Sequence, residues 1–281
     1  MQEILSTLNF IESAYKVFHL PIPTLVLSTR PENYIGNLEE WDRAESALKE
    51  ALEASGQSWT LNDGDGAFYG PKIDVILQDS DGKRHQTATV QLDFQLPQRF
   101  GLEYTAPAPA HEQKGLSTTD PALLAESGHV TPVIIHRAIM GSLERFMALL
   151  IEHYNGKWPF WLSPNQAIII PVATTPEIMA YAEATRRVIA GTPDSTAGAV
   201  PLSTRTFSVK LDDSTNSLSK KIRAAKTAGY NHIVVIGERD VAARTISVET
   251  RQAEGGTRAK PEEMTAGELY ARFRALEDSY A

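Results

Sequence analysis

Apolar side chains recur at a helical spacing in two stretches of residues 1–60, and a short apolar run separates them. From Ile4 to Tyr15 they repeat every three or four positions, which is typical of a helix with one buried face. Proline and glycine residues mark the ends of each stretch. The pattern predicts a helix over 2–18, a strand over 24–28 and a helix over 39–55.

The period then changes to two. Apolar and polar residues alternate over 72–78 and 84–94, which predicts two antiparallel strands, and Asp81-Gly82 favours a two-residue hairpin turn between them. On the second strand the alternation places Gln86 among the apolar side chains. The polar face of that strand is expected to carry Thr87, Thr89, Gln91 and Asp93.

Two neighbouring segments lack any period. Gly64, Gly66 and Gly70 match no phosphate-binding glycine motif, so this segment is predicted to be a turn. Residues 105–131 are rich in Ala, Pro, Ser and Thr and are expected to form a surface insertion.

An apolar strand over 133–135 leads through a glycine into a helix over 142–154. Arg145 lies in the first turn of this helix and is expected to be a buried arginine at the end of the sheet. The apolar residues of the helix are expected to share one buried face: Leu143, Phe146, Met147, Leu150 and Ile151.

Strands and helices alternate after the proline-aromatic segment 158–164. This order predicts a mostly parallel sheet with helices on both faces. Residues 191–204 are expected to form a loop insertion. The predicted strands are 167–172, 207–211, 232–236 and 245–248, and the predicted helices are 176–190, 218–228 and 266–276.

The composition is that of a globular protein. The chain has 281 residues, 42% of them hydrophobic, which is enough for two domains, expected at 1–162 and 163–281. The absence of cysteine excludes disulfides, thiolate metal ligands and a cysteine nucleophile. No apolar run has membrane-spanning length and no signal or transit pattern is present, so a cytoplasmic protein is expected.

The net charge of −8 is unevenly distributed. Residues 1–162 carry 12 Lys and Arg against 21 Asp and Glu, a net of −9, while 163–281 carry 15 against 14. Within 205–260 there are 11 basic and 6 acidic residues, a net of +5. This basic segment is either a solvated helix face or a surface for nucleic acid, and charge alone leaves both open.

Three segments, 66–72, 89–94 and 136–146, resemble class II aminoacyl-tRNA synthetases in the wording of their threonyl members, and the last resembles the third signature motif. The wording of 158–161 is similar to the eukaryotic cytosolic branch. The resemblance implies an α/β protein in two parts. An antiparallel-sheet (α+β) C-terminal half of the catalytic domain would occupy 1–162, and an α/β anticodon-binding domain with a mostly parallel five-stranded sheet would occupy 163–281.

The resemblance also implies roles for single residues. Tyr69 and Gln91 would face the substrate threonine. Gln86 would face the nucleotide only if a β-bulge separates it from Thr89; otherwise its assignment is wrong. Without the family resemblance, Tyr69 could be an ordinary half-buried tyrosine, and Arg145 could form a surface ion pair. The polar row of the strand over 84–94 could simply be a solvated face. The residues expected to contact ATP, which the family uses with Mg²⁺, are Arg145, Lys72, Gln86 and Thr89.

His136 resembles one of three zinc ligands of the threonyl enzymes, in which zinc holds the amino and hydroxyl groups of threonine. A histidine at the end of an apolar strand is otherwise an ordinary core residue. The other two family ligands, a cysteine and a histidine, come from preceding segments, and this chain contains no cysteine. It also lacks the first two signature motifs, which supply the dimer interface and an arginine for the α-phosphate. The chain alone is therefore expected to bind no tight zinc and not to activate threonine.

The second domain resembles the anticodon-binding domain shared by threonyl, prolyl, histidyl and glycyl enzymes, on the wording of 220–223 and 234–240. Glu249 departs from the arginine that is common at its position and is expected to oppose the tRNA backbone. Taken singly, each charge also fits a solvated surface. The residues expected to bind tRNA are Lys220, Lys221, Arg223, Asp240 and Arg251.

Two functions from different classes follow from these observations. The first is a threonine–tRNA ligase, or the C-terminal portion of one, with threonine, ATP and a threonine tRNA as partners. The second is a non-catalytic tRNA-binding or regulatory derivative of such an enzyme. A longer reading frame upstream, containing the missing motifs, would favour the first.

Overall fold

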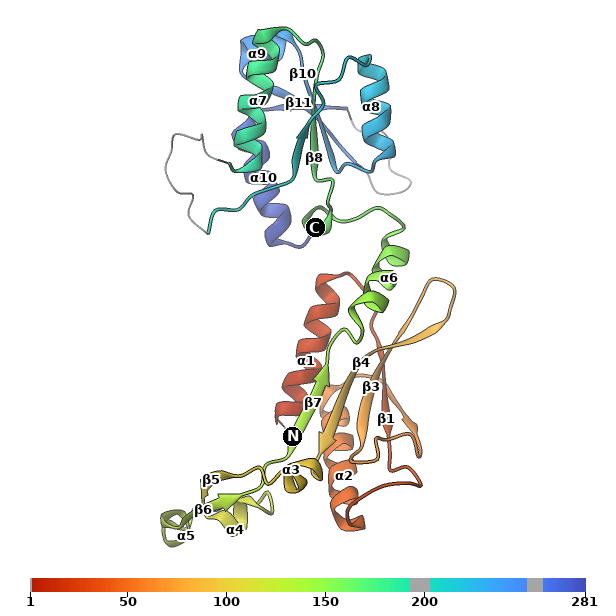
Figure 1. The fold of residues 1–281 in the computed structure, drawn as a ribbon, viewed down its shortest axis with the longest axis vertical. Coiled ribbons are helices and arrows are strands. Elements are labelled where there is room, and N and C mark those ends of the chain that lie inside the picture. Colours follow the sequence, from red (N-terminus) through yellow and green to blue (C-terminus); the bar gives the residue numbers. More distant parts are fainter. Residues whose placement is uncertain (1, 193–202, 252–259) are drawn as a thin grey trace. The chain divides into compact units, whose positions relative to one another are not determined.

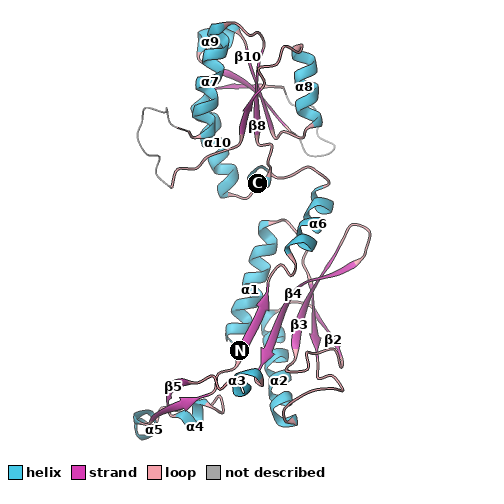
Figure 2. Cartoon of the chain, in the orientation of Figure 1, coloured by secondary structure: helices cyan, strands magenta, loops and turns pink. Residues whose placement is uncertain are grey.

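The computed structural model describes residues 2–192, 203–251 and 260–281. The chain divides into two compact units, residues 1–153 (unit 1) and 154–281 (unit 2), drawn by sequence in Figure 1 and by secondary structure in Figure 2. This division falls before the proline-aromatic segment, whereas the sequence pattern places it after residue 162. Most of the predicted loop at 191–204, and residues 252–259 of the basic segment, lie outside the described residues.

Unit 1 is built on a five-stranded sheet with the strand order β2-β1-β3-β4-β7. β1 pairs in parallel with β2, and the other neighbours are antiparallel, as expected for this half of the chain. The strands are β1 (Thr24–Ser28), β2 (Trp59–Asn62), β3 (Lys72–Gln78), β4 (Arg84–Asp93) and β7 (Ile134–Ala138).

Helices α1 (Gln2–Val17) and α2 (Leu38–Ser55) lie on one side of this sheet and bury their apolar faces. α2 begins at Leu38 because the side chain of Asn37 accepts a hydrogen bond from the Glu40 N–H at 2.9 Å. It ends at Gly56, whose φ of 69° is left-handed. The fully buried side chains of the unit include Ile4, Leu8, Ile11, Trp41, Leu48, Leu25 and Ile73.

The hairpin between β3 and β4 closes with a three-residue loop, so the predicted two-residue turn is wrong. The Asp79 N–H donates to the Lys83 carbonyl at 3.0 Å, which leaves Ser80 to Gly82 as the loop. Gly82 has a φ of 84°. A left-handed glycine at the end of a three-residue loop fits the strand twist as well as a two-residue turn does.

The surface insertion contains a small β-hairpin. β5 (Tyr104–Pro107) and β6 (Ser127–Val130) pair in antiparallel fashion, and short helices lie next to them. Four-residue strands are too short to show a period in the sequence, which is why only an irregular segment is predicted there. The short helices are α3 (Leu96–Arg99), α4 (Pro109–Glu112) and α5 (Pro121–Ala125).

α6 (Leu143–Tyr154) packs against α1 along a narrow line. The ring of Phe146 lies 6.2 Å from that of Tyr15 and 5.2 Å from that of Phe18. Of the predicted apolar face, Phe146 and Leu150 are buried, whereas Leu143, Met147 and Ile151 are 63%, 54% and 52% exposed. The predicted burial of Arg145 is wrong as well, because the first turn of α6 projects into solvent.

Unit 2 has a five-stranded sheet with the order β12-β11-β10-β8-β9. β9, β8 and β10 are mutually parallel, β11 is antiparallel to β10, and β12 is antiparallel to β11, so β11 alone runs against the others. This agrees with the mostly parallel sheet that the sequence predicts. The strands are β8 (Ala167–Pro171), β9 (Val209–Leu211), β10 (His232–Ile236), β11 (Ile246–Thr250) and β12 (Glu262–Met264).

Helices cover both faces of this sheet (Figure 2). Ala167 and Ile169 of β8 belong to a core with residues of α7 (Pro176–Ala190) and α10 (Ala266–Asp278). Ile168 and Ile170 point the other way and pack with α8 (Leu218–Thr227). The apolar run in β8 is therefore buried on both sides, as expected for the central strand of a parallel sheet.

The proline-aromatic segment belongs to unit 2. Phe160, in the short 3₁₀ helix η1 (Phe160–Leu162), is 3% exposed and its ring lies 4.5 Å from that of Phe273. The guanidinium of Arg251 donates to the carbonyl oxygens of Gly229, at 2.7 Å, and Trp158. Arg251 thus ties this segment to the rest of the unit.

Candidate functional site

A β-bulge organises the polar face of the unit 1 sheet. Val75 pairs with Ala88 and Ile76 pairs with Gln86, so Thr87 is an extra residue in β4. Thr87 is 4% exposed, and its hydroxyl accepts a hydrogen bond from the Tyr15 hydroxyl at 2.7 Å. The expectation that Thr87 lies on the polar face is therefore wrong. The bulge brings Gln86 to the same face as Thr89, as the nucleotide assignment of Gln86 requires.

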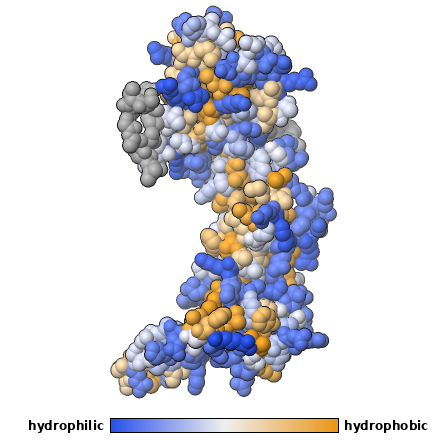
Figure 3. All heavy atoms as spheres, viewed as in Figure 1, coloured by the Kyte–Doolittle hydropathy of each residue, from blue (hydrophilic) through white to orange (hydrophobic). Residues whose placement is uncertain are grey.

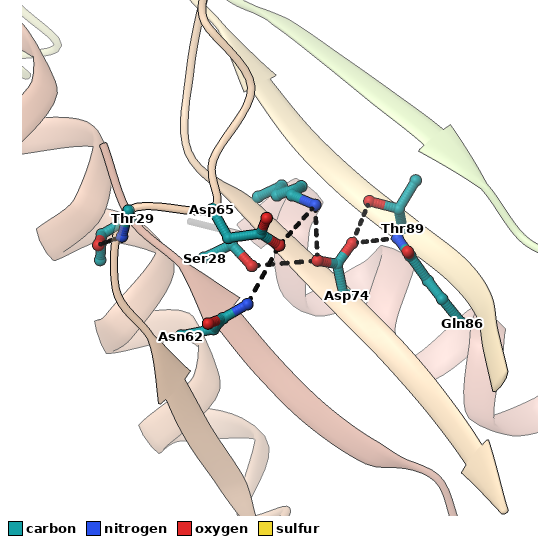
Figure 4. Close-up of polar contacts among 9 residues, drawn as sticks. Ser28, Thr29, Asn62, Asp65, Asp74, Gln86 and Thr89 are labelled. Carbon is teal, nitrogen blue, oxygen red and sulfur yellow. Dashed lines mark hydrogen bonds and ion pairs between the residues drawn. The ribbon is translucent and has the colours of Figure 1, made fainter. Parts of the chain in front are cut away.

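Asp74 of β3 is the centre of this polar face (Figure 4). One carboxylate oxygen accepts from the Ser28 hydroxyl at 3.0 Å and pairs with the Lys72 ammonium at 2.9 Å. The other accepts from the Gln86 amide and from the Thr89 hydroxyl, the latter at 3.1 Å. Three of the four residues predicted to contact ATP thus share one carboxylate, which the sequence reasoning missed. Asp74 could have been found from the sequence, because it lies two residues after Lys72 on one strand and the two side chains therefore share a face.

The loop over 62–70 borders this cluster. Asp65 accepts from the Asn62 amide at 3.1 Å and lies 3.4 Å from the Lys72 ammonium. A Cβ at Gly70 would lie 1.7 Å from the Leu92 carbonyl oxygen, so only glycine fits there. The segment makes turns that lead into a strand, in agreement with the predicted turn.

Tyr69 and Gln91, the two residues predicted to face threonine, are in contact. The Tyr69 hydroxyl donates to the Gln91 side-chain oxygen at 2.5 Å. Partial burial, and then the negative charge of Asp93, raise the pKa of Tyr69 above its usual value. The phenol is therefore a neutral hydrogen-bond donor near pH 7.

His136 lies beside the same pair of residues. Its ring is 5.9 Å from that of Tyr69, and its Nε2 lies 2.8 Å from a carboxylate oxygen of Asp93. Asp93 is fully buried, and its second oxygen accepts from the backbone N–H groups of Gln95 and Leu96. Across the described residues, no three His, Cys, Asp or Glu side chains come together as metal ligands. His136 alone does not make a zinc site.

Arg145 stands apart from these groups. It lies in the first turn of α6 with an exposed side chain. In the described part of the chain its side chain forms no ion pair, and its backbone N–H donates to the Ser142 hydroxyl at 3.4 Å. The structure therefore gathers Lys72, Gln86 and Thr89 but not Arg145.

Unit 2 presents a different arrangement, at the edge of its sheet. Because β9, β8 and β10 are parallel, their carboxyl ends lie along one edge. The chain leaves β8 towards α7 on one face, and leaves β9 towards α8 on the other. Such a reversal of strand order opens a crevice beyond the carboxyl ends of the two central strands. A cavity of about 310 Å³ lies there, lined by Val172, Ala173, Ile178 and residues 237–240.

The residues predicted to bind tRNA fall into two groups in unit 2. Lys220 and Arg223 are exposed on α8, which begins at the carboxyl edge. Asp240 lines the cavity there, and one of its carboxylate oxygens accepts from the Gly237 N–H at 2.8 Å. Lys221 is 4% exposed and donates to the Asp212 carbonyl at 3.0 Å, so it serves the fold.

Arg251 and Glu249 lie at the opposite edge of the sheet. Glu249 pairs in register with Ile233, near the start of β10. Its carboxylate lies 2.5 Å from the Lys226 ammonium. Burial lowers the pKa of Arg251, whose guanidinium hydrogen-bonds to backbone carbonyls. Both residues are therefore engaged within unit 2.

Two further cations lie at the carboxyl edge, and the sequence reasoning missed them. Arg239 and Arg244 are exposed, in and directly after the short helix α9 (Glu238–Ala243). Within the described residues neither forms an ion pair, and neither do Lys220 and Arg223. By contrast, Glu183 of α7 is paired with Arg186 and Arg187, and the hydrogen bond from Arg186 contributes most to lowering its pKa to about 2.

Unit 1 also contains an apolar cavity of about 490 Å³, between α1, α2 and the base of the insertion. Figure 3 shows hydrophobic surface gathered near the N-terminal end of α1. The residues that line the cavity include Ile4, Phe94 and Val133. Among the described helices, none combines the length and the apolar character needed to cross a membrane.

Comparisons with known proteins agree across the chain. Residues 166–276 match the family model of an anticodon binding domain. The chain is 45% identical over 249 residues to a probable mitochondrial threonine–tRNA ligase of Schizosaccharomyces pombe, covering 89% of this chain and 50% of that protein. It is 40% identical over 275 residues to the cytoplasmic threonine–tRNA ligase 1 of Rattus norvegicus, covering 98% of this chain and 34% of that protein.

A solved structure gives the same result. The RNA binding domain of threonyl-tRNA synthetase from Cryptosporidium parvum superposes with a TM-score of 0.77 at 36% identity, covering 98% of this chain and 60% of that one. The chain spans half or less of the length of the two curated relatives.

Proposed function

We propose that this chain, which has the sequence and fold of the C-terminal region of threonyl-tRNA synthetases, works as the tRNA-binding part of a threonine–tRNA ligase and supplies a share of its adenylate site. The observation that carries the proposal is the carboxyl edge of the unit 2 sheet. A cavity lies there, and α8 and α9 begin at this edge and carry four exposed cations, on or next to them, that form no ion pair among the described residues. All of these lie within the region that matches an anticodon binding domain.

Each part of this edge suits one part of an RNA loop. Lys220, Arg223, Arg239 and Arg244 are placed to contact backbone phosphates, which fix register without reading sequence. The cavity admits one unstacked base, and the carboxylate of Asp240 is an acceptor for a base amine. The tRNA would be a threonine tRNA, the substrate class of the related ligases.

The polar face of unit 1 is the proposed share of the adenylate site. Lys72, Gln86 and Thr89 would contact ATP, supplied with Mg²⁺, and Tyr69 with Gln91 would contact threonine. The threonine carboxylate would attack the α-phosphate of ATP and displace pyrophosphate. A hydroxyl of the terminal tRNA ribose would then attack the carbonyl of the threonyl adenylate and release AMP. Fixed positioning and fixed charges, rather than a covalent enzyme intermediate, would lower the barrier. Arg145 would join this site only through a movement of its exposed side chain.

Zinc is not part of this proposal for the chain alone. The described residues supply one ligand of the family type, His136, held by Asp93 at 2.8 Å. We propose that the protein acts in the cytoplasm. One relative is named as mitochondrial, and cell fractionation would distinguish the two compartments.

Binding of a threonine tRNA by the full chain at several salt concentrations tests the main proposal. Lys220→Gln should lower the slope of log affinity against log salt by about one, because one phosphate contact is lost. Lys226→Gln is the matched control, since this lysine is paired with Glu249 at the opposite edge, and the slope should not change. Absence of tRNA binding at low salt would overturn the proposal.

Threonine-dependent pyrophosphate exchange tests the catalytic share. The 281-residue polypeptide by itself should stay at background, because adenylate formation in this family also uses an arginine of another signature motif. Exchange well above background would show that the polypeptide is sufficient. If a longer natural form of the chain binds the tRNA and yet shows no exchange, the non-catalytic derivative is the correct function.

A further inference from the structure

Asp74 is buried, at 4% exposure, and four hydrogen-bond donors converge on it. They come from three strands of the sheet. A carboxylate offers about four acceptor sites, so all of its capacity is used. The donors are the Ser28 hydroxyl, the Lys72 ammonium, the Gln86 amide and the Thr89 hydroxyl.

The donors that point towards solvent retain groups for a ligand. Gln86 gives its amide N–H₂ to Asp74, so its carbonyl oxygen is left as an acceptor. The Thr89 hydroxyl gives its proton to Asp74, so its lone pairs are left. Lys72 has three N–H donors, of which Asp74 takes one and Asp65 engages a second, at 3.4 Å.

We infer that Asp74 is a positioning residue that sets the hydrogen-bond polarity of this face, so that it offers one ammonium donor beside two neutral acceptors. This inference rests on the nucleotide site proposed above for unit 1. Such a face fits a ligand that carries an anionic phosphate next to hydroxyl or amine donors, as a nucleoside triphosphate does. Asp74 acts through its neighbours, since its own oxygens are fully occupied.

The two carboxylates beside Lys72 have different roles. The Asp74 side chain is 6% exposed and fixed by four donors, whereas that of Asp65 is 59% exposed and lies in a loop. Burial acts to lower the pKa of Lys72, but hydrogen bonding and charge from Asp74, and then Asp65, outweigh it, and the pKa is raised. A phosphate can therefore displace Asp65 from Lys72 while Asp74 stays in place.

The first test is ATP binding by the full chain, measured by calorimetry at low ionic strength. Asp74→Asn should weaken binding at least about tenfold, because the new amide turns the Gln86 side chain and releases the ammonium. Asp65→Asn is the matched control, since it removes the other carboxylate beside Lys72. It should leave affinity unchanged or improve it a few-fold. Equal weakening by both substitutions would overturn the inference.

The second test separates positioning from simple loss of packing. The pH dependence of Lys72 acetylation, followed by peptide mass spectrometry, reports the pKa of Lys72 amid Asp74, Asp65 and Tyr69. Asp74→Asn should shift the midpoint down by about one pH unit, and Asp65→Asn by less than half of that. Asp74→Glu should leave the midpoint close to that of the wild-type chain, because it keeps the negative charge beside Lys72. If Asp74→Glu shifts the midpoint as far as Asp74→Asn does, Asp74 acts only through packing.

The two tests fail in distinguishable ways. If neither the wild-type chain nor any variant binds ATP, the proposed nucleotide site fails, and the positioning inference falls with it. If ATP binds and neither affinity nor the acetylation midpoint responds to Asp74→Asn, the nucleotide site stands and the inference alone is wrong.

Discussion

The two sheets of this protein place their functional groups in different locations. In unit 1, α1 and α2 lie on one side of the sheet. Polar side chains of β3 and β4, among them Asp74, Gln86 and Thr89, contact one another on the sheet (Figure 4). In unit 2, helices cover both faces, and the exposed cations gather where the strands end. A sheet with one free face can hold a ligand on that face, whereas a sheet covered on both faces leaves only its edge.

The same difference affects stability. Among the described residues, 15 of the 18 large apolar side chains that are exposed belong to unit 1. Unit 1 therefore exposes more large apolar side chains to solvent than unit 2 does, and it is expected to unfold or aggregate first. The predictions below test this contrast, beginning with the largest effect.

Phe273→Ala should reverse the order of unfolding. Phe273 is fully buried and its ring lies 4.5 Å from Phe160 and 5.4 Å from Phe207, so truncation should cost unit 2 about 3–5 kcal/mol. Hydrogen exchange in increasing urea, resolved by peptide, would assign each transition to its unit. Phe100→Ala, at a residue 70% exposed, is the control and should change neither. If the urea midpoint of unit 2 does not change, Phe273 does not contribute to the core of unit 2 as its burial indicates.

Acidification should destabilise unit 2 in a definite window. Burial, and then the positive charges of Arg272 and Arg251, lower the pKa of His232 from 6.5 to about 4. Above pH 6.5 the imidazole is neutral in both states. As the pH falls towards 4 the unfolded chain takes up a proton that the folded chain does not, so unit 2 loses on the order of 3 kcal/mol.

Urea unfolding of unit 2 at a series of pH values measures this loss. His232→Gln removes the titrating group and should flatten the profile between pH 6.5 and 4. An unchanged profile in this variant would assign the acid sensitivity to other groups.

Tyr15→Phe tests the link between the helix layer of unit 1 and the β-bulge at Thr87. It removes hydrogen bonds to the Thr87 hydroxyl, at 2.7 Å, and to the Ile139 carbonyl, at 3.2 Å. The expected loss is about 1 kcal/mol, confined to the unit 1 transition. Tyr104→Phe is the control, because its partner Glu112 is exposed on the insertion. A loss that appears in unit 2 instead would place the coupling elsewhere.

Glu249→Arg should have the smallest effect. The sequence alone suggests that this change tightens tRNA binding, but Glu249 is paired with Lys226 at the edge away from the free cations. We therefore expect tRNA affinity to change by less than about twofold, since a distant charge is largely screened by salt. A filter-binding titration is sufficient to measure this. Strong tightening would move the RNA surface to the opposite edge.

Much of the fold could be predicted from the sequence, because a long segment contains enough residues to show whether its apolar positions have a helical or a strand period. The two N-terminal helices, β3, β4 and the alternating elements of unit 2 follow directly from apolar spacing. Short strands such as β5 and β12 have too few residues to show a period. The apolar stripe of α6 could not be assigned correctly, because periodicity identifies an apolar face and not what covers it.

The candidate site was predictable in its residue types and less so in their contacts. Lys72, Thr89, Tyr69 and Gln91 lie on one sheet face by alternation and by family resemblance. Asp74, Arg239 and Arg244 were missed, since a single charge in a sequence does not reveal its neighbours. Conversely, Lys221 and Arg251 look like surface cations in the sequence, and the tertiary structure turns both inwards to backbone carbonyls.

The extra residue in β4 has a consequence for how this gene can vary. Before Thr87, even-numbered positions of the strand face the polar side, and after it odd-numbered positions do. A complete substitution scan of β4 should therefore show two patterns of tolerance that are out of phase, with the change at Thr87. A single-codon deletion of Thr87 would remove the bulge and leave the pairs Val75–Ala88 and Ile76–Gln86 in one regular register, so the two segments would keep their present faces, whereas deletion of a neighbouring codon would turn part of the strand over.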